Sequence, residues 1–207
     1  ARKRPREVAT VATALRIATD AANAGVKAFS DGATTTEAMV AAERTARVNK
    51  ARDIRILANV DSADLRPFEG LSPARRAPLL LWIGVDYHGY WADVAVTSPS
   101  SASSQAAKSV DTMASAAKAG ASTADVARAG LAKLSSAASE SALDYGLGSG
   151  IGLALSDGLS IGPDTNERLV DGALLSLRTL ARDGDDVSFA NAIVQVGADA
   201  GHKLDPR

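Results

Sequence analysis

The sequence predicts an α+β fold in which helices cover a curved, mostly antiparallel sheet, arranged as two pseudo-symmetric halves. Two observations lead to this prediction. In two stretches of the chain, apolar residues recur at three- and four-residue steps, the period of an amphipathic helix. After each stretch come apolar runs of strand length, bounded by turn residues. With 207 residues, 46% of them apolar, the chain can bury one sizeable core, so we expect a single domain over residues 1–207.

The first half opens with two helices. Apolar positions from 8 to 29 fall on one helical face, and Gly32 ends that helix. Thr34 and Glu37 then form a capping-box pattern, in which the two side chains bind free N–H groups of a new first turn. We expect this second helix to run through residues 39–48.

The middle of the chain changes to strands. Residues 54–57 favour one strand, and the five bulky residues at 79–83 predict a buried strand that is covered on at least one face. A turn over residues 86–89 leads to another strand over residues 90–97. The last two strands are therefore expected to form a hairpin.

The second half follows a similar plan. A serine-rich link at 98–104 precedes a helix that begins at about Gln105 and ends at Gly120, and Ser122 starts a second capped helix. This order of helix, glycine and capped helix echoes the one at 27–37, which supports two halves of similar structure. Three strands are expected in the last third: residues 152–155, 173–177 and 187–196.

Composition and charge exclude several classes of protein. The net charge is −1, and we interpret the basic residues Arg2, Lys3, Arg4 and Arg6 as a solvated end, so no nucleic-acid partner is expected. The longest wholly apolar run, residues 78–83, is far too short to cross a membrane. The sequence has no cysteine and no signal-peptide pattern, so we expect a cytoplasmic protein.

Five segments in order resemble a known superfamily, the creatinase/aminopeptidase P/methionine aminopeptidase group with its M24-type pita-bread domain. Residues 79–93 resemble its strand hairpin, and residues 145–153 resemble its glycine-rich segment. Residues 172–178, 188–194 and 201–204 then resemble its later strands. The resemblance spans nearly the whole chain and implies the pita-bread fold.

The resemblance also implies where metal ligands belong. In that superfamily two Asp, one His and two Glu side chains hold two divalent metal ions that activate a water for amide hydrolysis. These five positions fall on Trp82, Asp93, Ser149, Arg178 and Ala190 of this chain. Only Asp93 is an acid, and Arg178 carries a permanent positive charge that repels a cation. We therefore expect no metal, no other cofactor and no metallopeptidase activity.

The replacement residues suggest a site of another kind. A further His and the Glu after it in the superfamily fall on Ser156 and Asp157. Candidate catalytic residues are thus Asp93, Asp157 and Ser149, and candidate substrate-binding residues are Arg178, Trp82, Tyr90 and Ser156. We expect Arg178 to form an ion pair with Asp93. Neither His88 nor His202 matches a superfamily position, so Ser149 lacks a histidine base.

Two functions are open at this point. The first is a metal-independent lyase, isomerase or hydrolase that acts on a small polar or anionic molecule. The second is a non-catalytic module that binds a peptide or protein. The polar replacements favour the enzyme, whereas the loss of four of the five ligands favours the binding module. Together they favour the enzyme very slightly, with the binding module as the alternative. The ligand expected is a small molecule or a peptide, and a homodimer is left open.

Overall fold

The computed structural model describes residues 2–99 and 104–206, so the serine-rich link at 98–104 falls mostly outside the described residues. The first half holds two helices and four strands. They are α1 (Pro5–Ser30), α2 (Thr35–Val48), β1 (Asp53–Ala58), β2 (Arg66–Pro67), β3 (Leu79–Tyr87) and β4 (Tyr90–Ser98). The two predicted helices, the strand near residue 54 and the predicted hairpin are all present.

The second half holds three helices and four strands within the described residues. They are α3 (Gln105–Ala116), α4 (Thr123–Leu131), α5 (Ser136–Tyr145), β5 (Gly148–Gly150), β6 (Leu174–Asp183), β7 (Asp186–Val196) and β8 (Gly201–Lys203). None of the helices in the described ranges is long and apolar enough to cross a membrane.

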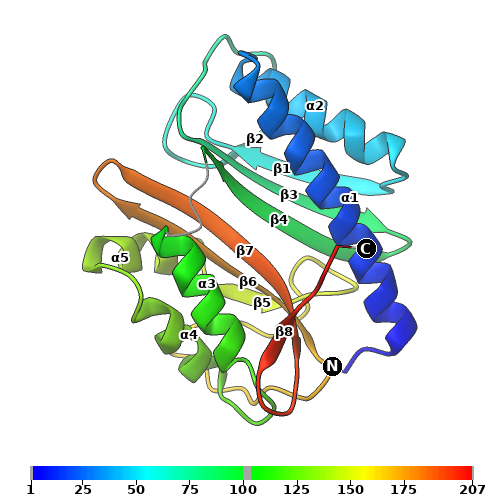
Figure 1. The fold of residues 1–207 in the computed structure, drawn as a ribbon, viewed down its shortest axis with the longest axis vertical. Helices are drawn as coiled ribbons and strands as arrows, with labels where there is room; N and C mark the ends of the chain where they lie inside the picture. The colour runs from blue at the N-terminus through cyan, green and yellow to red at the C-terminus, as the bar shows by residue number, and fades with distance from the viewer. Residues whose placement is uncertain (1, 100–103, 207) are drawn as a thin grey trace.

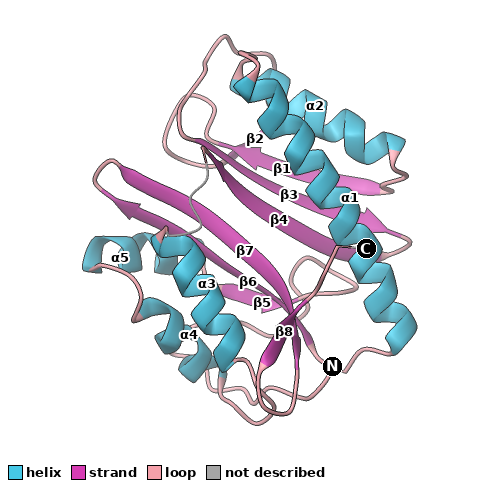
Figure 2. Ribbon diagram, in the orientation of Figure 1, coloured by secondary structure: helices cyan, strands magenta, loops and turns pink. Residues whose placement is uncertain are grey.

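Each half forms one antiparallel sheet with its own helices. The strand orders are β2-β1-β3-β4 and β5-β6-β7-β8, with every neighbouring pair antiparallel. Helices α1 and α2 cover the first sheet, and α3, α4 and α5 cover the second (Figure 1). Figure 2 shows the same division, with the helices outside and the strands of both sheets meeting in the middle. The α+β pita-bread prediction is confirmed.

The two sheets meet along β4 and β7 through side chains. Asn191 on β7 accepts a hydrogen bond from Ala95 N at 2.7 Å and donates one to Asp93 O at 2.9 Å. Thr97 on β4 donates to Phe189 O at 3.2 Å, and Phe189 N donates to Thr97 Oγ1 at 2.6 Å. Buried backbone groups need partners, and these two polar side chains supply them where no strand ladder joins the sheets.

Local sequence explains where the helices begin. Thr34 Oγ1 accepts from Glu37 N at 3.2 Å, and Glu37 Oε2 accepts from Thr34 N at 2.8 Å, so the predicted capping box forms. Ser122 caps α4 in the same way, accepting from Asp125 N at 3.1 Å. Both capped helices follow a glycine of positive φ, as the sequence repeat predicts.

Two sequence predictions were wrong or imprecise, and one helix was missed. Residues 152–155 form a loop, and the strand lies earlier, at Gly148–Gly150. Gly152 has φ +156, and a Cβ added there would lie 2.6 Å from Cε of Lys3, so this position of the loop suits glycine. Helix α3 ends at Ala116, four residues before Gly120, and α5 was not predicted from the sequence.

Candidate functional site

The centre of the candidate site is a buried pair formed by Trp82 and Asp93. Trp82 lies on β3 and Asp93 on β4, and the indole Nε1 donates to Asp93 Oδ2 at 2.9 Å. Asp93 is 1% exposed and Trp82 is 9% exposed. The indole packs in an apolar cluster with Leu80, Leu180 and Phe189. The centre is therefore filled by a side chain and sealed from solvent.

The surroundings of Asp93 disfavour its charged form. Burial raises the pKa of Asp93, while the Ser176 hydroxyl, the Trp82 indole and the Arg178 guanidinium act in the opposite direction. Ser176 is close enough to lower the pKa, but its hydroxyl does not reach hydrogen-bond geometry with either Asp93 oxygen. Within the described residues, Asp93 Oδ1 and Ser176 Oγ are buried without a hydrogen-bond partner.

Arg178 does not form the ion pair that the sequence predicted. No ion pair or side-chain hydrogen bond joins Arg178 to any described residue, and its buried Nε has no partner. Asp93 is instead held by the indole of Trp82. The Arg178 guanidinium carbon lies 5.9 Å from the centre of the Tyr145 ring, within reach of a cation–π contact. Arg178 is half-buried, so this cation faces the site without a counter-ion.

The other two candidate catalytic residues are held by contacts of their own. Ser149 Oγ donates to Leu155 O at 3.4 Å, and no histidine is among its described hydrogen-bond partners. Asp157 forms an ion pair with Lys3, Nζ to Oδ2 at 2.7 Å, and the Lys3 side chain is only 7% exposed. Lys3 thus ties the loop after β5 to the N-terminal segment. Neither arrangement resembles a nucleophile with its base.

The pairing of β6 with β7 shows which residue of β7 faces the site. Arg178 pairs with Asn191 across β6 and β7, whereas Ala190 pairs with Thr179. Directly opposite residues share a face of the sheet, so Asn191 faces the site and Ala190 points toward the helices. Ala190 accordingly packs beside the apolar clusters of the second half. Ala190, on which the resemblance places the second glutamate, therefore does not face the site, whereas Asn191 does, and its amide already bonds to β4.

A shallow depression of about 280 Å³ opens beside the sealed centre. Trp82, Tyr145, Leu155, Ser156 and Arg178 line it. The structure thus brings three of the predicted binding residues together. Tyr90, the fourth, is not in the lining: its hydroxyl donates to Glu7 Oε1 at 2.8 Å, which ties β4 to the first turn of α1.

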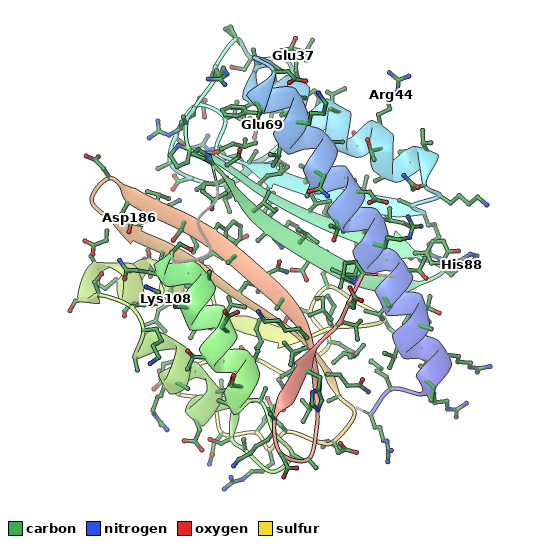
Figure 3. The ribbon with its side chains drawn as sticks, in the orientation of Figure 1. Glu37, Arg44, Glu69, His88, Lys108 and Asp186 are labelled. Atoms are coloured by element: carbon green, nitrogen blue, oxygen red, sulfur yellow. The ribbon has the colours of Figure 1, made fainter. Side chains whose placement is uncertain are left out.

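The histidines lie elsewhere. His88 is exposed at the turn between β3 and β4, with φ 52, and projects outward at the end of the hairpin (Figure 3). His202 on β8 lines a separate cavity at the N-terminal segment, next to Arg2 and Arg4. Neither is among the residues of the depression, as the sequence predicted.

Sequence reasoning missed Ser176 and Tyr145. Ser176 lies two residues before Arg178 on β6, so the two-residue alternation of a strand could have placed it on the same face. It pairs with Ser149 across β5 and β6. Tyr145 ends α5, a helix the sequence did not reveal, so no local signal was available. Burial raises the pKa of Tyr145 to about 12, which keeps the phenol neutral.

The residues present do not fit the metal pair that the resemblance implies. Among the described residues, no group of three or more His, Asp or Glu side chains could hold a metal ion. One Asp93 oxygen accepts the indole N–H, and the Asn191 amide is used at the sheet junction. A dication needs several anionic oxygens together, and this centre offers one carboxyl beside a guanidinium.

Solved structures of similar fold include peptidases. The prolidase from Pyrococcus horikoshii OT3 has a TM-score of 0.82 at 15% identity, covering 99% of this chain and 63% of that one. The X-Pro aminopeptidase from Thermotoga maritima MSB8 has a TM-score of 0.79 at 17% identity, covering 98% of this chain and 61% of that one. This chain therefore spans less than two thirds of either protein.

The fold also occurs in a subunit of a complex. The N-terminal domain of FACT complex subunit SPT16 from Cicer arietinum has a TM-score of 0.70 at 15% identity, covering 99% of this chain and 58% of that one. A search of curated proteins gives no significant match. The family model of metallopeptidase family M24 matches residues 9–197, nearly the whole chain. With the fold and the order of its motifs in agreement, the chain belongs to metallopeptidase family M24.

Proposed function

We propose that this M24 domain binds a small-molecule or peptide ligand and does not hydrolyse peptide bonds. The observation that carries the proposal is the contact between Trp82 and Asp93. The Trp82 indole donates a hydrogen bond to Asp93, the one acid at a metal-ligand position of the superfamily. The indole also fills the volume beside Asp93 with apolar atoms. Water activation by a metal pair has no set of ligands to support it here.

The remaining polar residues favour binding over catalysis. Asp157 is neutralised by Lys3, Ser149 donates to a backbone carbonyl, and Asp93 is sealed from solvent. A general acid or base must reach the proton that it transfers, and a nucleophile needs a base beside it. These contacts weigh against the metal-independent enzyme and support the binding module, while the open depression with Arg178 gives a ligand a place to dock.

The pita-bread fold is compatible with either peptide hydrolysis or ligand binding. Its solved relatives include a prolidase, an aminopeptidase and a domain of the FACT complex subunit SPT16. Function is determined by the site and not by the fold, so a pita-bread domain can serve as a binding unit.

The test combines metal analysis with a hydrolysis assay on the whole chain. We expect far less than one transition-metal ion per chain after purification in buffer with Mn²⁺. We also expect no release of proline from an Xaa-Pro dipeptide above the blank, with the Pyrococcus horikoshii prolidase as positive control. Two metal ions per chain, together with hydrolysis that Asp93→Asn abolishes, would overturn the proposal. Metal-free turnover of a small molecule that Asp93→Asn or Asp157→Asn abolishes would overturn it in favour of the enzyme.

A further inference from the structure

The depression beside Trp82 has a cation on one side and apolar walls on the other. Arg178 comes from β6, Tyr145 from the end of α5, and Trp82 from β3. Leu155 and Ser156 come from the loop after β5, which Lys3 holds in place through Asp157. Side chains from these four segments thus form one concave surface of about 280 Å³.

The guanidinium of Arg178 is the feature that points to a ligand. It is half-buried and lacks an ion-pair partner among the described residues, and its Nε is buried without an acceptor. Arg52 provides a contrast on the same fold, since its more exposed guanidinium bonds to Asp86 at 2.9 and 2.5 Å. Partial burial of an unpaired cation is costly, and an incoming anion offsets that cost.

Two more buried polar atoms lie near Arg178, in the sealed centre and not in the lining of the depression. Asp93 Oδ1 and Ser176 Oγ lack partners within the described residues, and both residues are 1% exposed or less. Native structures leave few buried polar atoms unpaired, so the incomplete hydrogen bonding around Arg178 sets this region apart. Ser176 lies on the same face of its sheet as Arg178, because it precedes Arg178 by two residues on β6. Asp93 belongs to β4 of the other sheet.

The side chains that line the depression favour a carboxylate over other anions. A single planar guanidinium matches the two oxygens of a carboxylate, whereas phosphate sites usually gather several cations or backbone N–H groups. The Trp82 indole, the Tyr145 ring and Leu155 offer an apolar surface for a short hydrocarbon or aromatic group. The exposed hydroxyl of Ser156 adds a donor at the rim.

We infer that this depression binds a monocarboxylate with a short apolar or aromatic tail. Its carboxylate bonds to Arg178, and its tail lies against Trp82, Tyr145 and Leu155. The inference rests on the proposed binding function and names the class of ligand for that site. A free acid and the C-terminal carboxylate of a peptide share this chemistry, and the experiment separates them.

The experiment measures binding to the whole chain by titration calorimetry and tryptophan fluorescence at neutral pH. The probes are benzoate, hexanoate and the dipeptide Ala-Leu, with benzamide as the uncharged counterpart of benzoate. We expect a carboxylate to bind and benzamide not to. Arg178→Gln is expected to weaken binding by about tenfold or more, because it removes a charge-assisted pair of hydrogen bonds. Arg44→Gln, which removes a cation that projects outward from α2, is the matched control and leaves binding unchanged (Figure 3).

A second variant keeps the inference testable if Arg178→Gln does not fold. Ser156→Trp places a bulky group at an exposed position of the rim and is expected to block the probes while leaving Arg178 in place. Binding of Ala-Leu alone assigns the site to peptide ends, and binding of the free acids assigns it to small molecules. No binding of any carboxylate at millimolar concentration, equal binding of benzamide, or equal binding to Arg178→Gln overturns the inference. Metal content and dipeptide hydrolysis test the proposed function independently of these results.

Discussion

The two sheets contribute different kinds of side chain to the site. The first sheet supplies Trp82 and Asp93, which bond to each other inside an apolar cluster. The second supplies Ser176 and Arg178 on β6, each with a buried polar atom that lacks a partner in the described part of the chain. Asp93 Oδ1 of the first sheet also lacks one, but it lies in the sealed centre, whereas Arg178 lines the open depression. The first sheet therefore closes the centre, and the second presents a cation beside it.

The contrast is also one of stability. Apolar packing and satisfied hydrogen bonds stabilise the folded state, whereas a buried polar atom without a partner destabilises it. The side chains of β3 and the sheet junction should thus be the sensitive positions. Polar side chains of β6 should tolerate substitution with little loss of stability. The predictions that follow rank the centre, the sheet junction and the N-terminal link by the same argument.

The largest loss of folding stability is expected for a substitution of Trp82, in the centre of the first sheet. Trp82→Ala should lower the free energy of unfolding by about 3–5 kcal/mol, because it opens a cavity and removes the donor to Asp93. Urea denaturation followed by circular dichroism measures the change. Trp91→Ala, at a half-buried tryptophan on β4, is the control and should cost clearly less. Equal losses in the two variants would show that Trp82 has no special role in closing the centre.

The sheet junction is expected to be next in sensitivity. Asn191→Ala should cost about 2–3 kcal/mol, because it leaves Ala95 N and Asp93 O without their partner. Asn49→Ala removes a single hydrogen bond, to Thr45 O at the end of α2, and serves as the control. A cost for Asn191→Ala no greater than for the control would mean that the junction does not depend on this side chain.

The link between Lys3 and Asp157 should have a smaller effect. Lys3→Met should cost about 1–2 kcal/mol, below the range for fully buried pairs because Asp157 is 36% exposed. The same variant should loosen the loop that carries Leu155 and Ser156, and it should weaken the binding of the carboxylate probes. Hydrogen exchange of residues 152–158 reports the loop directly. Unchanged exchange there would remove Lys3 from its proposed positioning role.

The smallest loss of folding stability is expected for Asp93→Asn, and the size of this loss should depend on pH. The pKa of Asp93 is raised in the folded state, so the folded protein holds this proton more tightly than the unfolded chain. Its contribution to stability is fully present below the unfolded pKa and is lost as pH rises through the folded pKa. Asparagine reproduces the neutral carboxyl and still accepts from Trp82, so the variant should gain stability relative to the wild type as pH rises.

Urea denaturation at several pH values from about 4 to 8 measures this difference. Asp61→Asn, at an exposed residue of the loop after β1, is the control for the same change of side chain at the surface. A difference between Asp93→Asn and the wild type that is constant with pH, or that changes in the opposite direction, would show that Asp93 is charged in the folded protein.

Some elements could be predicted because their signals are local. The helix through Phe29, the capping box of Thr34 and Glu37, and the hairpin around His88 each depend on residues within a few turns or one strand pair. Helix α5 could not be predicted, because its small alanine and serine residues give a weak apolar face and only Ala138 and Ala142 are buried. The two-residue strand β2 is too short to leave a pattern.

The candidate site was predictable only in part. The order of the M24 motifs placed Trp82, Asp93, Ser149 and Arg178 at one centre, and the strand ladders put them on facing strands. The same reasoning put Ala190 where Asn191 lies, because a shift of one residue reverses the face of every side chain in a strand. Tyr90 was predicted to line the site because of its place in the hairpin. Its hydroxyl instead donates to Glu7, 83 residues earlier in the chain.

The sequence alone therefore determined the family and the pita-bread fold, since these depend on residue identities in a fixed order. Tertiary structure decided which replaced side chains bond to each other. Asp93 accepts from Trp82 and not from Arg178, and Arg178 is left facing an open depression. These outcomes depend on distances of a few ångströms between strands far apart in sequence. Periodicity fixes the face on which a side chain lies, but it does not fix the partner that the side chain meets there.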